Sequence, residues 1–269
     1  MSEKKFTIRR IPLKGLNNTR DLGGLETTDG RKVKKHRLIR SGELAKATKS
    51  DIDTLKYEYK LKKIVDLRTD VEMERKPDPD IYEVDFEHVP FVDESTVGIT
   101  REKSVVSSAV SMIKSMEQTP HEYMQGMYRA LVSEKSSIEN VKRFFEILLE
   151  NEEGSVLFHC SAGKDRVGAA TAILLSLLGV DRKTIIRDYL ATQKFGEKYN
   201  KKYETLAAVL SKNKRVTEYA GVFLSTNKDF LLAFFAEIEE KYSSVSEYAR
   251  ICLGLDAEKQ EKLKALYLE

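Results

Sequence analysis

The sequence predicts an α/β fold in which a central, mainly parallel sheet is flanked by helices on both faces. Short apolar runs typical of buried strands alternate with longer segments that have helical character. The helical segments outnumber the strands, as expected when helices cover both faces of a small sheet. The length of 269 residues, with 41% hydrophobic residues, suffices for one large core. A single domain spanning 1–269 is therefore expected.

The expected elements follow from local composition and from the turn-forming residues between the segments. A helix over 50–61 precedes strands over 63–67 and 82–89, and a polar segment, 93–103, comes next. The rest of the chain then reads as helices over 106–116, 120–132 and 137–151, a strand over 155–158, and helices over 166–178, 184–192, 229–242, 246–251 and 256–267.

The strand over 155–158 and the helix over 166–178 enclose the most informative loop. The strand is short and apolar and follows a turn at 152–154, whereas the helix is rich in Ala and Leu and ends at Gly179. A strand, a tight loop and a helix N-terminus together form an anion cradle, because unpaired backbone N–H groups and the positive end of the helix dipole point into the loop. The sequence therefore predicts a phosphate site here.

Two side chains of this loop are suited to react with or bind a phosphoryl group. Cys160 lies at the carboxyl end of the strand, and a helix N-terminus beside a cation favours its thiolate, the form that attacks phosphorus. Arg166 has a planar fork that grips two phosphoryl oxygens. His159 is expected to hold the loop and keep Cys160 ionised. The remaining loop residues are Ser161, Ala162, Gly163, Lys164 and Asp165.

The run HCSAGKDRVG at 159–168 resembles the signature of the PtpB-like family of bacterial tyrosine and lipid phosphatases. That resemblance implies a protein tyrosine phosphatase-like fold, a cysteinyl-phosphate intermediate and no metal or other cofactor. It also implies substrates ranging from phosphotyrosine to phosphoserine, phosphothreonine and phosphoinositides. Further likeness to the family lies at 18–24, 29–31, 38–44, 64–68, 90–93 and 181–190.

Expulsion of an alkoxide or phenoxide requires a carboxylic acid that protonates it. Asp93 is the first choice, because it follows an apolar run at a strand-to-loop transition and matches the position of the acid in the family. A solvated loop carboxylate is the alternative interpretation. Asp165 is the competitor, since it lies inside the loop itself, although it would repel phosphate unless protonated or paired.

Two positions bear on substrate and turnover. Lys164 adds positive charge at the loop and favours polyanionic substrates, although a solvated lysine is the alternative. Val167 stands where the family usually carries Thr or Ser. A hydroxyl there is expected to stabilise the departing thiolate, so valine predicts slow breakdown of the intermediate and keeps open a second reading, a phospho-ligand binding module with impaired turnover.

The N-terminal block contains turn formers and two arginines beside short apolar runs. Arg20 and Arg40 could support the phosphate loop from behind or approach the substrate. Structural ion pairs with Asp21, Glu43 or Asp66 are the favoured interpretation. Asp21 is nonetheless kept with the two arginines among the supporting site residues.

Basic residues gather between 194 and 215, beside apolar positions that suggest a helical face. The range 194–245 is therefore a possible helical cover or insertion, with a rim that guides anionic substrates or contacts an anionic membrane. An amphipathic helix with a solvated lysine face is the favoured interpretation.

Global composition excludes several classes. With 46 basic and 43 acidic residues, the net charge of +3 argues against a nucleic-acid partner. The remaining histidines have no ligand-like spacing, and no apolar run approaches the roughly 20 residues that span a bilayer. The two cysteines are too few for a disulfide scaffold, so a reducing, cytoplasmic location is expected, with secretion left open. The sequence does not indicate an oligomeric state.

Overall fold

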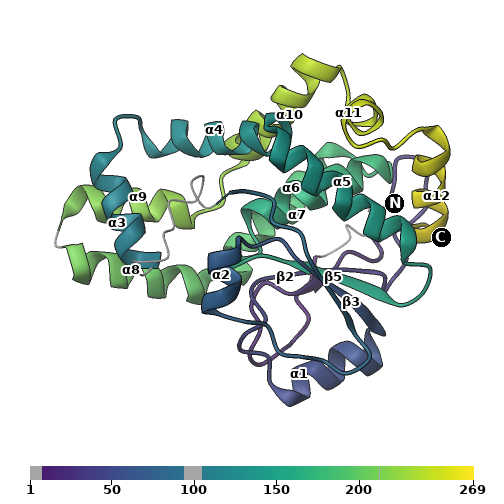
Figure 1. Cartoon of the computed structure of the whole chain (residues 1–269), viewed down its shortest axis with the longest axis horizontal. Helices are drawn as coiled ribbons and strands as arrows, with labels where there is room; N and C mark the ends of the chain where they lie inside the picture. The colour runs from purple at the N-terminus through teal and green to yellow at the C-terminus, as the bar shows by residue number, and fades with distance from the viewer. Residues whose placement is uncertain (1–7, 94–104, 212) are drawn as a thin grey trace, which may run out of the picture.

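The computed structural model describes residues 8–93, 105–211 and 213–269. Its centre is a sheet whose strands, in spatial order, are β1 (Arg20–Asp21), β2 (Leu38–Ser41), β5 (Ser155–His159), β3 (Leu61–Asp66) and β4 (Asp85–His88) (Figure 1). Strands β2, β5, β3 and β4 are parallel, whereas the short β1 pairs antiparallel with β2. The predicted α/β class with a mainly parallel sheet is confirmed.

The helices dominate the remainder of the described chain, as predicted. They are α1 (Lys49–Asp53), the π-helix η1 (Thr54–Glu58), α2 (Asp70–Arg75), α3 (Val105–Ser115), α4 (Pro120–Ser133), α5 (Lys135–Glu150), α6 (Asp165–Leu177), α7 (Arg182–Phe195), α8 (Glu197–Ser211), α9 (Lys214–Leu224), α10 (Lys228–Tyr242), α11 (Val245–Cys252) and α12 (Ala257–Tyr267).

The strongly periodic segments are present with small shifts at their ends, but the first predicted helix is too long. Helical structure ends at Glu58, and β3 already begins at Leu61. Between them Lys60 has a left-handed backbone with a φ of 52°, through which an α-helix cannot continue. Helix α2 and the strands β1 and β2 were not predicted.

The two faces of the sheet bury two separate cores. In β5, Val156 and Phe158 belong to the large core beneath α4 to α7 and α10 to α12, whereas Leu157 belongs to the smaller core on the other face. The smaller core includes Leu55 from η1 and Leu16 from the N-terminal segment. Because successive side chains of a strand point to opposite faces, β5 is buried on both sides and holds the residues that follow it firmly.

The range 194–245 divides into two parts in the structure. Helix α10 packs on α4 and α7 and contributes Phe230, Phe234 and Phe235 to the large core. Helices α8 and α9 pack mainly against each other, with smaller contacts to α3, α4 and α7, and the pair extends away from the sheet (Figure 1). Whether this pair acts as a cover stays a prediction.

Candidate active site

The predicted strand, loop and helix are present around Cys160. Strand β5 ends at His159, α6 begins at Asp165, and Cys160 is only 2% exposed. Gly163 has a φ of 66°, and a Cβ atom there would lie 2.4 Å from the carbonyl oxygen of Ser41, so the loop needs glycine. The side chain of Lys164 does not cap α6, which leaves the first N–H groups of this helix for a ligand.

Three successive carbonyl groups of the loop are held on its outer side. The backbone N–H of Glu43 donates to the Ser161 carbonyl at 3.1 Å. The side-chain amide of Asn18 donates to the carbonyls of Ala162 at 3.1 Å and Gly163 at 2.8 Å. In a trans peptide the N–H points opposite to the C=O. These bonds therefore direct the next three N–H groups, those of residues 162–164, toward the inner side of the loop.

Arg20 and Arg40 are fully buried and share one carboxylate, that of Asp188 in α7. Arg20 Nε donates to Asp188 Oδ1 at 2.7 Å, and Arg40 Nη1 donates to Oδ2 at 2.5 Å. Arg40 also donates to the Gly163 carbonyl at 3.0 Å, and Arg20 donates to the Asn18 side chain. Both arginines thus connect α7 to the phosphate loop. The prediction that they pair with Asp21, Glu43 or Asp66 is wrong, because both pair with Asp188.

Asp21 shapes a turn away from the loop. Its carboxylate accepts hydrogen bonds from the backbone N–H groups of Gly23 and His36, each at 2.8 Å. Burial raises the pKa of Asp21, although these two N–H groups oppose that shift. The aspartate therefore holds the N-terminal segment in shape and does not contact the phosphate loop in the described residues.

Replacing Asp188 by asparagine is expected to cost about 3–5 kcal/mol of unfolding free energy, because two buried guanidinium groups lose their counterion. Burial would raise the pKa of Asp188, but Arg20 and Arg40 outweigh it and lower the pKa. A lowered folded-state pKa gives stability that is full above the unfolded value of about 3.9 and is lost as the pH falls through the folded value. Urea titrations at neutral and acidic pH would measure both effects.

Asp181→Asn is the matched control, because Asp181 caps the same helix at its exposed N-terminus and asparagine caps equally well. Its unfolding free energy should stay within about 0.5 kcal/mol of the wild-type value. An Asp188→Asn variant as stable as this control would contradict the assigned counterion role.

Arg166 is held by Glu72 from the unpredicted helix α2. Its two terminal nitrogens donate to the two carboxylate oxygens of Glu72 at 2.5 and 2.9 Å, and the Ser161 hydroxyl donates to Glu72 Oε1 at 2.5 Å. Burial alone would raise the pKa of Glu72, but Arg166 and Ser161 outweigh it and lower the pKa to about 2. The fork of Arg166 is therefore fixed in direction by a charged partner.

Lys164 is buried, so the interpretation as a solvated lysine is wrong. It is 4% exposed, and its ammonium donates to the carbonyls of Phe223 and, at 2.9 Å, Ser225. Both carbonyls lie at the C-terminal end of α9, where the helix dipole favours a cation. Lys164 thus connects the phosphate loop to the α8–α9 pair.

The two candidate acids have different surroundings. Asp165 begins α6; its Oδ1 accepts a hydrogen bond from the Tyr128 hydroxyl at 2.8 Å, and its Oδ2 lies 3.5 Å from the Lys164 ammonium. Asp93 is exposed, and its carboxylate accepts a hydrogen bond from the Ser136 hydroxyl at 3.2 Å. The structure therefore brings Asp165 to the loop, whereas the described contact of Asp93 leads to the start of α5.

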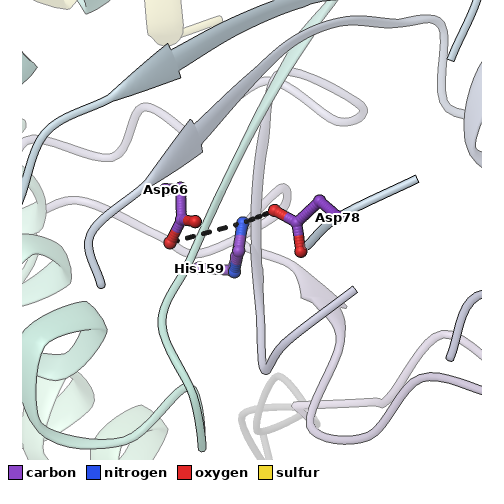
Figure 2. Close-up of side chains that lie close together, drawn as sticks. All are labelled: Asp66, Asp78 and His159. Carbon is purple, nitrogen blue, oxygen red and sulfur yellow. Dashed lines mark ion pairs between the residues drawn. The ribbon is translucent and has the colours of Figure 1, made fainter. Parts of the chain in front are cut away.

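A buried charge cluster lies at the carboxyl ends of β5 and β3, beside the point where the chain enters the loop at Cys160. His159 Nε2 is 2.7 Å from Asp78 Oδ2 and 3.8 Å from Asp66 Oδ1, and Figure 2 shows the ring between the two carboxylates. Aspartate and histidine atoms lie close enough for a metal ion, within 4.8 Å of one another. Arg68 nevertheless contacts Asp66 at 2.7 Å and Asp78 at 3.0 Å. The Arg68 guanidinium already occupies an oxygen of each carboxylate, and its positive charge would repel a cation there, so the cluster does not fit a metal site.

A family model described as the tyrosine phosphatase family matches residues 11–269. The chain belongs to the tyrosine phosphatase family. It is 28% identical over 244 residues to a putative tyrosine-protein phosphatase of Cupriavidus necator, covering 90% of this chain and 83% of that protein. It is 25% identical over 267 residues to the triple specificity protein phosphatase PtpB of Mycobacterium tuberculosis, covering 91% of this chain and 94% of PtpB.

The sequence did not reveal three acidic residues of this tyrosine phosphatase that contact the 159–166 segment or its supports: Glu72, Asp78 and Asp188. Glu72 had a local signal, because Thr69 and Glu72 form a capping box that marks a helix start. Asp78 and Asp188 meet their partners only through the fold. Among the described helices of this phosphatase, none is long and apolar enough to cross a membrane.

Proposed function

We propose that this phosphatase hydrolyses phosphomonoesters through a cysteinyl-phosphate intermediate, with Cys160 as nucleophile. The Cys160 thiolate attacks phosphorus, the bond to the leaving oxygen breaks, and a carboxylic acid protonates that oxygen. Water then attacks phosphorus, the S–P bond breaks, and the carboxylate takes the proton from water. The enzyme returns to the thiolate, and inorganic phosphate leaves.

The strand–loop–helix around Cys160 is the observation that carries this proposal. Inward N–H groups of the loop and the uncapped start of α6 suit a tetrahedral dianion beside the sulfur. Both terminal nitrogens of Arg166 now donate to Glu72. When phosphate binds, the same guanidinium would donate two further hydrogen bonds to its equatorial oxygens. His159, Arg20 and Arg40 support the loop, and no step needs a metal ion.

Phosphotyrosine is the substrate class that the family itself suggests, and phosphoserine, phosphothreonine and phosphoinositides are proposed in addition. The triple specificity in the printed name of the mycobacterial relative supports this breadth. A pocket against the loop supports it too, because Lys46 and Lys164 line it, although Glu43, which is paired with Lys76, lines it as well. A second phosphate there would contact Lys46 directly but would have to compete for Lys164 with the carbonyls at the end of α9.

Phosphate release from a matched panel in the presence of chelator tests the proposal. The panel holds phosphotyrosyl and phosphoseryl peptides, soluble inositol phosphates, and phosphoinositides in vesicles with and without anionic phosphatidylserine. The vesicle arms test the proposed contact of the basic α8–α9 surface with an anionic membrane. No release from any substrate, with phospho-ligands still bound, would favour the alternative of a binding module.

Val167→Thr is expected to accelerate steady-state turnover by about tenfold or more, since a hydrogen bond to a charged group contributes about 1.5–3 kcal/mol. Val167 is fully buried in the first turn of α6 and offers no donor to the departing thiolate. Wild type should then show a burst of leaving group before the steady state, which rapid-mixing kinetics would detect.

Val167→Ala is the control, because it removes side-chain volume without adding a hydroxyl. It should not accelerate turnover. A wild type without a burst, together with a threonine variant no faster than wild type, would contradict the prediction that Val167 slows hydrolysis of the cysteinyl-phosphate intermediate.

A further inference from the structure

Asp78 occupies a rigid position behind the catalytic cysteine. It lies between Pro77 and Pro79 in the segment that joins α2 to β4. Proline fixes its own φ and restricts the residue before it to extended conformations, so this short run has little freedom. The Asp78 side chain is only 3% exposed, and its carboxylate faces His159 at 2.7 Å. The Asp78 carboxylate is therefore fixed between the His159 imidazole and the Arg68 guanidinium.

The charges around His159 balance only when its ring is protonated. Asp66 and Asp78 bring two negative charges, and Arg68 brings one positive charge. Asp66 approaches the ring from the end of β3 and Asp78 from the 76–84 segment, while Arg68 contacts both carboxylates. A net buried charge is costly, so an imidazolium at His159 completes a neutral set of four. In agreement, His159 and Arg68 lower the pKa of Asp66 even though burial alone would raise it.

We propose that Asp78 is a positioning residue that keeps His159 protonated behind the phosphate loop and thereby keeps the neighbouring Cys160 as thiolate. The inference rests on the proposed function of Cys160 and adds a residue to it. Asp78 acts through His159 and touches neither substrate nor the sulfur. Its segment follows α2, whose Glu72 holds Arg166, so one stretch of chain contacts both His159 and Arg166.

His159 is one of several cations that favour the thiolate. Arg40 and Arg166 also interact electrostatically with Cys160. Glu72 offsets part of the Arg166 charge, and Asp165 lies beside it. Losing the imidazolium should therefore weaken the preference for thiolate without abolishing it. A shift of about one pH unit is the size expected for one neighbouring charge.

The test measures the rate of Cys160 alkylation by iodoacetamide as a function of pH in Asp78→Asn and in wild type, with Cys252→Ser in both. The midpoint of the profile should move about one unit higher in Asp78→Asn. Asp80→Asn is the matched control, because Asp80 is an exposed carboxylate in the same segment, and its profile should superimpose on that of wild type. Superimposed profiles of Asp78→Asn and wild type would overturn the proposal.

A double-mutant cycle asks whether the effect travels through His159. With His159→Gln already in place, adding Asp78→Asn should move the midpoint no further, and an undiminished second shift would also overturn the proposal. If Asp78→Asn does not fold, Asp78→Ser removes the same charge with a smaller side chain. Alkylation needs no turnover, so a chain that binds phosphate without hydrolysing it leaves this test intact.

Discussion

Replacing Cys160 by serine is expected to lower turnover of a phosphotyrosyl peptide by about four orders of magnitude or more. Loss of a covalent nucleophile removes the reaction path and not merely one contact. The loop should keep its shape, because its carbonyl groups are held by Asn18 and Arg40 and not by the sulfur. The same variant should therefore still bind the phosphopeptide. Stopped assays of phosphate release and calorimetric titration would measure the two properties side by side.

Cys252→Ser is the matched control for this experiment. Cys252 is the other cysteine of the chain and lies half-buried at the end of α11, outside the loop. Its removal should leave turnover within about twofold of wild type. Turnover that survives Cys160→Ser would exclude the cysteinyl-phosphate mechanism. Turnover absent in both wild type and variant, with binding retained in both, would identify a binding module.

The sequence predicts the loop well because all of its signals are local. The apolar strand and the Ala-rich helix are recognised within one short segment, and the structure confirms both; it adds that Gly163 between them has a left-handed backbone. The supports of the loop are not local. Arg20 and Asp188 are 168 residues apart in sequence, and nothing in the sequence near Arg20 marks that aspartate as its partner.

Strands β1 and β2 were missed for a related reason. Each contains a fully buried arginine, Arg20 or Arg40, which interrupts the apolar pattern by which a buried strand is recognised. Such strands depend on Asp188, whose single carboxylate pairs with both guanidinium groups in the interior. Strand assignment here depends on an ion pair that the tertiary fold creates.

Asp165→Asn is expected to slow hydrolysis of a phosphoseryl peptide by about 10²–10⁴-fold, the usual contribution of a general acid. We propose Asp165 in place of the first choice from sequence, because Asp165 lies at the loop and is held by Tyr128. Burial and the charge of Asp165 raise the pKa of Tyr128 well above 10, so the tyrosine remains a hydrogen-bond donor across the working pH range.

Leaving-group dependence separates this role from mere loop support. A nitrophenolate departs without help, so Asp165→Asn should lose far less activity on p-nitrophenyl phosphate than on the phosphoseryl peptide. A damaged loop would lose activity on both substrates equally. Asp93→Asn is the paired comparison, because its carboxylate is exposed and bound to Ser136, and its losses on the two substrates should be small and alike. If the selective loss instead appeared in Asp93→Asn, the acid would be Asp93, and Asp165 would serve to hold Lys164 and the start of α6 in place.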